Sequence, residues 1–465
     1  MNLKYIILCG LGFVVIGNVN AQETMTLEKC RELALENNKS SAIAERTKEK
    51  AEYTRKAYRA NYFPKISATG NYLYTNAEMN NTIPGNYLPT FVPDPATGEL
   101  APNILTTGSD GNPIFKEYAY FPEMDLSLKL SGTWMAGLQA QQPIYTGGKI
   151  TSGYNMAKIG NEIAGLNQDL TRTEIIAKTD EAYWTYVQTN ELLKLAVSYH
   201  KVVAELLHNV QEAQTVGLKH TNDVLKVQVK LNEAELQILQ AKNGVNLSRK
   251  NLCHIMGAPL NTVIILPESF EDIQSIQFDR SANYADRPEY AILEQQVRLK
   301  EQEIKLTRSD FLPQIGIMAN YGYINGLKLN GNKLLDKASF SVMASVNIPL
   351  FQWGEGHNKI RAAKAERDIM QLQCDDIGEM MELELARALD KCTESALEVE
   401  LTIKSLQQAE ENMKISADRY NGGMETLADH LEAQTVWQRA WSELIRAKTM
   451  YRLSETLYLK AAGKL

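Results

Sequence analysis

The sequence predicts a mixed, mostly α-helical fold in which one structural unit occurs twice. Three observations carry this prediction. Two short motifs return at constant offsets along the chain, four segments of about ten residues alternate apolar and polar side chains, and two stretches of about 65 residues lack proline. Together they predict four amphipathic β-strands and two long antiparallel helical hairpins in each chain.

The N-terminal segment is predicted to be a signal peptide. Lys4 precedes an apolar run from Ile6 to Ile16, and compact residues lead up to Ala21. We expect cleavage after Ala21, which makes residues 1–21 the signal. No later apolar stretch reaches the roughly 20 residues of a membrane helix, so an exported chain of this kind crosses a membrane only as amphipathic strands, or not at all. The net charge of −7 argues against a nucleic-acid partner.

The internal repeat is defined by two motifs. Residues 62–66 return as residues 311–315, 249 positions later, and residues 142–148 return as residues 348–354, 206 positions later. The difference of 43 positions places an insertion in the first copy. That insertion, at residues 76–132, is rich in Asn, Pro and Gly and is predicted to be a long loop.

The register of the repeat also divides the chain. We expect a first repeat at residues 22–257, a connecting or equatorial segment at residues 258–284 and a second repeat at residues 285–465. Each repeat has the order helix, strand, loop, strand, long helix, turn, helix. The repeat therefore predicts two strands and one long helical hairpin in each half of the chain.

Four segments have the period of two that is typical of strands, at about residues 65–75, 133–144, 314–324 and 339–349. Each has the length of a transmembrane β-strand, with aromatic residues toward its ends. A water-soluble antiparallel sheet with one buried face is the alternative interpretation.

Long helices are predicted at residues 148–216, 221–256, 354–421 and 426–463. Their apolar residues step by three and four, which is typical of coiled-coil packing. In the first hairpin the seam consists of Val224, Val227, Leu231, Ala234, Ile238, Ala241 and Val245. In the second hairpin small residues recur every seventh position, at Ala433, Ala440, Ala447 and Ser454, so we expect neighbouring helices to approach closely.

Four strands are too few to close a barrel in a membrane, for which about eight is the practical minimum. An open strand edge in lipid leaves backbone groups unpaired at a cost of several kcal/mol each. The strands of one chain must therefore be completed by other copies, and a dimer, a trimer or a tetramer satisfies this requirement.

The chain resembles the TolC-like outer-membrane efflux proteins, also called outer membrane factors. The resemblance covers nearly all of the sequence after the signal peptide. It is carried by residues 26–38 and 287–290, by the prolines at the strand starts (Pro64, Pro313), by the Pro-x-x-x-x-Gly strand ends (Pro143 to Gly148, Pro349 to Gly354) and by the helical turns at Gly217 and Gly423. It implies a homotrimer with a shared 12-stranded β-barrel in the outer membrane of a Gram-negative bacterium, and a helical tunnel in the periplasm.

The resemblance further implies a passive exit duct for small molecules and drugs. Its partners would be an inner-membrane efflux transporter, a periplasmic adaptor (membrane fusion protein) and outer-membrane lipid. No phosphate-binding loop is present, so energy would come from a partner. We expect no enzyme activity, catalytic residue, cofactor or metal site. One alternative is the outer-membrane duct of a type I protein secretion system; another is a soluble periplasmic coiled-coil scaffold.

Scattered histidines and cysteines are expected to be structural. The six His residues lack metal-site spacing. His220 and His430 lie near the turns of the two helical hairpins, which we call the tips, and are predicted to be solvated surface side chains. Outside the signal, four cysteines lie in helical patterns without disulfide or zinc spacing and are predicted to be small buried side chains: Cys30, Cys253, Cys374 and Cys392.

A periplasmic gate is expected where the second helical hairpin turns. Asp429 and Glu432 are three positions apart and so share one helix face. The resemblance implies that this acidic pair forms rings at the narrow entrance of the trimer. Facing like charges attract cations, so we expect a cation-preferring constriction that divalent cations block. A solvated helix face is the alternative.

The closed state and the docking of the adaptor are also assigned through the resemblance. Asp223 and Tyr420 match one polar link that closes the family's entrance. The second link uses an arginine and a threonine, whereas this chain has Glu425 and Asn222 there, so we expect a differently set gate with additional negative charge. Tip turns and adaptor docking are assigned to Gly217, Leu218, Thr221, Gly422, Gly423 and Thr426.

Overall fold

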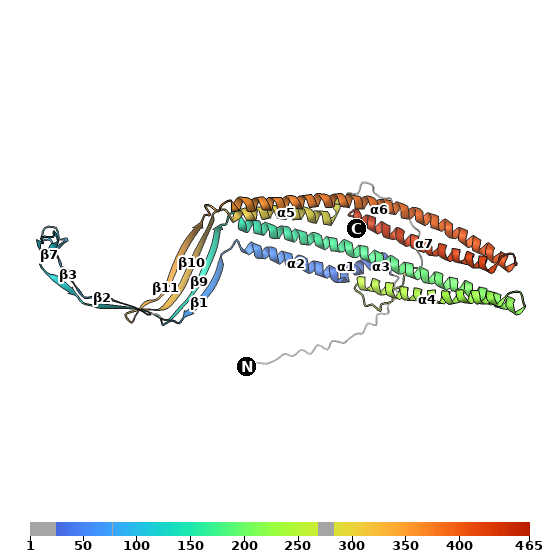
Figure 1. Ribbon diagram of the computed structural model, residues 1–465, viewed down its shortest axis with the longest axis horizontal. Helices are drawn as coiled ribbons and strands as arrows, with labels where there is room; N and C mark the ends of the chain where they lie inside the picture. The colour runs from blue at the N-terminus through green and yellow to red at the C-terminus, as the bar shows by residue number, and fades with distance from the viewer. Residues whose placement is uncertain (1–24, 77, 268–282) are drawn as a thin grey trace, which may run out of the picture. The chain divides into compact units, whose positions relative to one another are not determined.

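The computed structural model describes residues 25–76, 78–267 and 283–465 (Figure 1). The predicted signal peptide lies outside these residues, as do residues 268–282 of the connecting segment. The chain forms two compact units. The strand unit contains residues 56–155 and 302–363, and the helical unit contains the other described residues.

The strand unit is built on one antiparallel sheet with the order β1-β9-β10-β11 (Figure 1). Its strands are β1 (Lys65–Leu73), β9 (Met124–Tyr145), β10 (Gln314–Leu329) and β11 (Asn332–Asn347). β1 and β11 lie at the two ends of this order. Large apolar side chains of the sheet are exposed, among them Ile66 at 74% and Phe340 at 68%. The sheet therefore presents apolar surface that its own chain does not cover.

The hairpin of β10 and β11 is longer than the alternation of apolar residues predicts. The predicted strands end at about residue 324 and resume at about residue 339, because charged residues interrupt the apolar pattern between them. The pairing continues to Leu329 and Asn332. Asn330 and Gly331 form the turn with φ of 49° and 80°, the conformation that a two-residue type I′ hairpin requires and that Asn-Gly favours.

The prediction of a long loop at residues 76–132 is wrong. This segment contains seven short strands and the beginning of β9. Their antiparallel pairing is nested: β2 pairs with β9, β3 pairs with β8, and the hairpins β4-β5 and β6-β7 lie between β3 and β8 in the sequence. The short strands are β2 (Glu78–Ile83), β3 (Asn86–Pro89), β4 (Phe91–Pro93), β5 (Leu100–Pro102), β6 (Ile104–Thr107), β7 (Pro113–Phe115) and β8 (Tyr118–Phe121). The glycines that suggested a loop instead mark tight turns, as at Gly98 and Gly111, where φ is 74° and 78°.

The helical unit contains most of the helical residues of the chain. Its hairpins pair α3 (Lys149–Thr215) with α4 (Thr221–Ile255) and α6 (Glu355–Asn421) with α7 (Leu427–Ala461), and α3 and α6 begin in the strand unit. The shorter elements are α1 (Leu27–Asn37), α2 (Lys39–Ala60), η1 (Tyr284–Asp286) and α5 (Pro288–Ser309). At 1.5 Å per residue, α3 and α6 are each about 100 Å long. None of the described helices is long and apolar enough to cross a membrane.

The predicted mostly helical fold with long hairpins and strands is confirmed. Near the turns, one apolar core joins both hairpins, with Val203 and Val227 from the first and Trp437 and Ala440 from the second. Val227 and Ala234 of the predicted seam are completely buried. The prediction for the cysteines is confirmed as well, because all four are buried and free.

Candidate functional site

Both helical hairpins reverse through the same backbone motif. Gly217 and Gly423 have φ of 79° and 71°, a conformation that glycine adopts without steric cost. At the first turn the amide of Leu218 donates to Ala213 O at 2.9 Å and the amide of Gly217 donates to Gln214 O at 2.9 Å. The second turn repeats both bonds through Met424 and Gly423. These are Schellman motifs, which satisfy the last carbonyl groups of α3 and α6.

The two turns present apolar side chains to solvent. Leu218 is 77% exposed and Met424 is 70% exposed. Gly422, next to the second turn, does not have positive φ, but a Cβ there would lie 3.1 Å from the Met424 Cε atom. A side chain at Gly422 would therefore require the end of Met424 to shift. The first tip also exposes Val216, at 70%, so both tips project apolar groups into solvent.

The acidic residue Asp429 takes part in capping α7. The amide of Asp429 donates to Thr426 Oγ1 at 3.2 Å, and Thr426 Oγ1 donates to Asp429 Oδ2 at 2.7 Å. This arrangement satisfies an otherwise free amide of the first turn. Asp429 and Glu432 are both exposed. The carboxylates of the predicted gate are therefore accessible, and one of them also stabilises the helix start.

The first tip carries different chemistry at the equivalent positions. His220 occupies the N-cap of α4 without a side-chain cap bond, and Thr221 accepts from Gln214 Nε2 at 3.1 Å. Asp223, which corresponds to Asp429 in the repeat, lies 3.8 Å from Lys226 Nζ. Asn222 is exposed at the start of the same helix.

Tyr420 is held between groups from both tips. Its ring is stacked on His430 with centroids 5.1 Å apart, and Lys219 Nζ lies 4.3 Å from the ring centroid on α6. The Tyr420 hydroxyl is buried and has no hydrogen-bond partner among the described residues. Within the described chain Asp223 pairs with Lys226, and Tyr420 contacts Lys219 and His430. No hydrogen bond joins Asp223 to the Tyr420 hydroxyl among these residues.

Glu425 points toward α6 instead of toward solvent. Its side chain is only 14% exposed and lies 3.7 Å from Arg419 Nε. Ser416 Oγ donates to Glu425 Oε1 at 2.5 Å. The expected additional negative charge at the entrance is thus turned inward and compensated by a cation of the same tip.

The prediction that His430 is a solvated side chain is wrong. His430 is 5% exposed, and its ring nitrogens lie 3.0 Å from Ser416 Oγ and 2.9 Å from Gln434 Nε2. The repeat contained the signal for this burial. The position equivalent to His430 is Val224, which belongs to the apolar seam of the first hairpin.

Burial of His430 makes the second tip sensitive to pH. Desolvation lowers the pKa of His430 from its ordinary value of 6.5, and Glu425 partly opposes the shift. The neutral ring therefore stabilises the fold fully above about pH 6.5, and this contribution is lost as the pH falls through the lower pKa of the folded state.

We expect amide hydrogen exchange in residues 414–432 to be faster at about pH 5.5 than at about pH 7.5, once the rates are corrected for the pH dependence of intrinsic exchange. The variant His430→Gln keeps a polar side chain but does not titrate in this range. It should lose most of the pH dependence, whereas His220→Gln in the exposed first tip should retain it. An unchanged pH dependence in His430→Gln contradicts this assignment.

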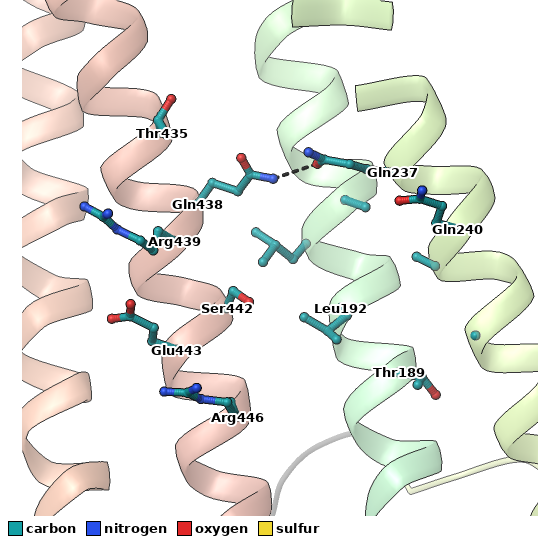
Figure 2. A pocket seen from close by; sticks show the side chains of 14 residues that line it. Thr189, Leu192, Gln237, Gln240, Thr435, Gln438, Arg439, Ser442, Glu443 and Arg446 are labelled. Atoms are coloured by element: carbon teal, nitrogen blue, oxygen red, sulfur yellow. Dashed lines mark hydrogen bonds between the residues drawn. The ribbon is translucent and has the colours of Figure 1, made fainter. Parts of the chain in front are cut away.

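A groove separates the two hairpins away from the tips (Figure 2). It has a volume of about 670 Å³ and is lined by α3, α4 and α7. Figure 2 shows Gln438 Nε2 reaching across it to Gln237 Oε1, at 2.7 Å. Arg439, Glu443 and Arg446 line the side formed by α7. Leu192, Leu195 and Ala196 of α3 give the groove an apolar side as well, and sequence reasoning missed it. In the part of the chain that the structure describes, no cluster of three His, Cys, Asp or Glu side chains is arranged to hold a metal ion.

Comparison with known proteins gives a consistent result for sequence and fold. The model of the family "Outer membrane efflux protein" matches residues 30–258 and 283–463. The fold is similar to the CmeC outer membrane channel of Campylobacter jejuni, with a TM-score of 0.72, 20% identity and coverage of 94% of this chain and 85% of that one. It is also similar to the open MtrE channel of Neisseria gonorrhoeae, with a TM-score of 0.70, 18% identity and coverage of 94% and 88%.

Curated relatives have names of two kinds. The alkaline protease secretion protein AprF of Pseudomonas aeruginosa is 23% identical over 69% of this chain and 67% of its own length. The probable efflux pump outer membrane protein TtgC of Pseudomonas putida is 21% identical over 63% of this chain and 61% of its own length. Matches therefore span about two thirds of these relatives. The family model covers most of the chain, and the chain therefore belongs to the outer membrane efflux protein family, as a TolC-like, non-enzymatic channel protein of the outer membrane of Gram-negative bacteria.

Proposed function

We propose that three copies of this chain form a passive exit duct across the outer membrane and the periplasm. The observation that carries the proposal is the antiparallel sheet whose order begins at β1 and ends at β11 while its apolar side chains remain exposed. In lipid, both end strands need partners for their backbone groups. Joining β11 of one copy to β1 of the next closes 12 strands in a trimer and satisfies those groups.

The helical hairpins would continue the duct into the periplasm. In this proposal the turns at Gly217 and Gly423 lie at the far end, where a periplasmic adaptor docks. The projecting side chains of Leu218 and Met424 supply the apolar contact that such docking needs. The chain lacks a nucleotide-binding loop, so an inner-membrane transporter supplies the energy.

The gate is proposed to be an acidic ring at the tips. Asp429 and Glu432 are exposed on one helix, and three copies would bring six carboxylates around the axis. Such rings select cations and bind divalent ions. The stacked Tyr420 and His430, together with Lys219, would hold the second tip beside the first in each copy.

Small molecules are the first proposed cargo, and secreted protein is the second. Efflux is supported by the names of relatives such as TtgC of Pseudomonas putida. Protein secretion is supported by AprF of Pseudomonas aeruginosa and by the proteases secretion protein PrtF of Dickeya chrysanthemi, which is 20% identical over 59% of this chain.

The cargo proposal is tested by deleting the gene and complementing it with the wild-type chain. For efflux, the deletion strain should become more sensitive to a panel of drugs and detergents, with an unchanged set of secreted proteins. For type I secretion, one or more proteins should disappear from the medium while drug sensitivity stays unchanged. Restoration by the wild-type chain is required in either case, and a deletion that alters neither export nor sensitivity contradicts the proposed duct.

A further inference from the structure

The strand unit carries a basic region at the end of the sheet where its strands meet the long helices. At this end of the sheet Ile315 pairs with Tyr145 and Gln314 pairs with Asn347, while β1 begins at Lys65 opposite Gln141, four residues before the end of β9. We call the chain segments at this end the collar. The collar consists of residues 56–65, 143–155, 302–314 and 348–361.

The distribution of charge changes sharply between the sheet and the collar. The strand segments at residues 66–74, 133–142, 315–323 and 338–347 contain no Asp, Glu, Lys or Arg. The collar contains eight basic residues, Lys56, Arg59, Lys65, Lys149, Lys305, Arg308, Lys359 and Arg361, and three acidic residues, Glu303, Asp310 and Glu355. A chain with a net charge of −7 therefore concentrates positive charge beside an uncharged band.

Two collar lysines are already neutralised. Lys149 Nζ lies 2.8 Å from Asp310 Oδ1, and Lys359 Nζ lies 2.6 Å from Glu355 Oε1. Arg59 and Lys65 are exposed beside β1, and Lys305 and Arg308 are exposed beside β10. Among the described residues these four make no ion pair with a carboxylate, so their charges are available to an external anion.

Lys305 and Arg308 share a cavity of about 380 Å³. The cavity lies between the last turn of α5 and the first turns of α3, and its polar lining includes Ser152, Asn155 and Gln302. Gly147 and Gly148 form part of its wall, and a Cβ at Gly147 would lie 2.7 Å from Ser309 O. Two cations with neighbouring hydroxyl and amide groups suit a phosphate group.

Exposed aromatic side chains accompany the basic residues. Phe63 is 59% exposed before β1, Tyr145 is 46% exposed at the end of β9, and Trp353 is 89% exposed after β11. Trp353 has φ of 50°, which is costly for a bulky residue, and its ring packs on Phe351 with centroids 4.9 Å apart. Aromatic side chains next to an apolar band are typical of the boundary between a membrane and water.

We propose that the collar binds the phosphate groups of anionic phospholipids in the periplasmic leaflet of the outer membrane, with Lys305 and Arg308 holding one phosphate in their cavity. The proposal rests on the proposed function in one respect, because it requires the sheet to cross the outer membrane. Charge complementarity selects this occupant: an uncharged band contacts acyl chains, aromatic rings lie at its border, and basic groups reach the headgroups.

The test uses the full-length trimer in nanodiscs made from equal amounts of phosphatidylglycerol and phosphatidylcholine. Native mass spectrometry after release from the disc measures which lipids remain bound. The wild-type trimer is expected to retain phosphatidylglycerol over phosphatidylcholine. The variant Lys305→Gln with Arg308→Gln should retain roughly tenfold less phosphatidylglycerol, because each basic group near an anionic surface contributes a severalfold effect.

Control variants separate the cavity from general effects of charge. Lys391→Gln with Lys404→Gln removes two exposed lysines from α6 in the helical unit and should retain phosphatidylglycerol like the wild type. Lys305→Arg with Arg308→Lys keeps both charges and should do the same. Should the glutamine pair not assemble, Arg59→Gln with Lys65→Gln tests the collar, with a severalfold loss expected.

Equal retention of both lipids by the wild type overturns the proposal, and so does a loss that the α6 control shares. Failure of the proposed function is distinguishable from these results. In that case the wild-type protein would not be recovered as a trimer in the nanodisc. A correctly inserted trimer without lipid preference contradicts only the proposal that the collar binds anionic phospholipid.

Discussion

Replacing Asp180 with alanine is expected to lower the free energy of unfolding of the helical unit by about 3–5 kcal/mol, because it leaves a partly buried cation without its partner. Asp180 is completely buried on α3. Arg31 of α1 donates to both carboxylate oxygens, at 2.7 and 2.6 Å. Thr456 Oγ1 of α7 also donates to Oδ2, at 2.6 Å. One carboxylate thus joins three helices.

The ion pair with Asp180 also changes the pKa of Arg31. The hydrogen bond to Asp180 raises the pKa of Arg31 despite its partial burial, so Arg31 stays charged throughout the range in which the protein folds. Loss of the carboxylate leaves the Arg31 guanidinium next to the apolar cluster around Cys30 and Leu252.

Native-state hydrogen exchange of α1 and of the middle of α3 measures this effect on the full-length protein in detergent. Thr456→Val removes one hydrogen bond to a charged group and should cost about 1.5–3 kcal/mol. The double variant Arg31→Met with Asp180→Leu replaces both charges with apolar groups and should be much less destabilised than Asp180→Ala. A loss below about 1 kcal/mol in Asp180→Ala would show that the network contributes little.

The second large effect is expected at the proposed gate. Replacing Asp429 and Glu432 with alanine should abolish the block of single-channel current by divalent cations. Six exposed carboxylates around one axis attract divalent ions strongly because their fields add. Removing them all leaves the constriction without its charge, so monovalent current should persist when divalent ions are added.

Asp429 has a second role that the experiment must separate from charge. Its contacts with Thr426 cap α7, and loss of such a cap costs about 1 kcal/mol. The variant Asp429→Asn with Glu432→Gln removes charge while keeping side chains that hydrogen-bond, and it should also lose the block. Glu379→Gln with Glu382→Gln, an exposed acidic pair with the same spacing on α6, should keep it. Unchanged block in both gate variants contradicts the assignment.

The sequence predicted the repeated elements well because periodicity and repeat register reinforce each other. Helix bounds such as those of α3 and α6 follow from long proline-free seams that end at a glycine. The misjudged regions lacked such support. The β10–β11 hairpin continues through charged residues that interrupt the apolar pattern, although Asn330-Gly331 was a readable turn signal. The insertion has no counterpart in the second repeat, so its short strands had no register to reveal them.

The candidate site was less predictable, because the contacts at the tips depend on whether each side chain points toward solvent or toward the neighbouring helix. The spacing of Asp429 and Glu432 placed them on one face, and both are exposed. It did not indicate that Glu425 turns inward to Ser416 and Arg419. Burial of His430 could have been inferred from its apolar counterpart Val224, since the second repeat places a polar network where the first has an aliphatic side chain.

If the chain is one third of a closed duct in the outer membrane, the mass of the protein extracted from purified outer membranes in mild detergent shows it most directly. Light scattering, with correction for bound detergent, should give a particle of three chains in the outer-membrane fraction. Introduced cysteines should cross-link β11 of one copy to β1 of the next. A monomer, or a protein recovered in the soluble periplasmic fraction, would contradict the closed trimeric duct.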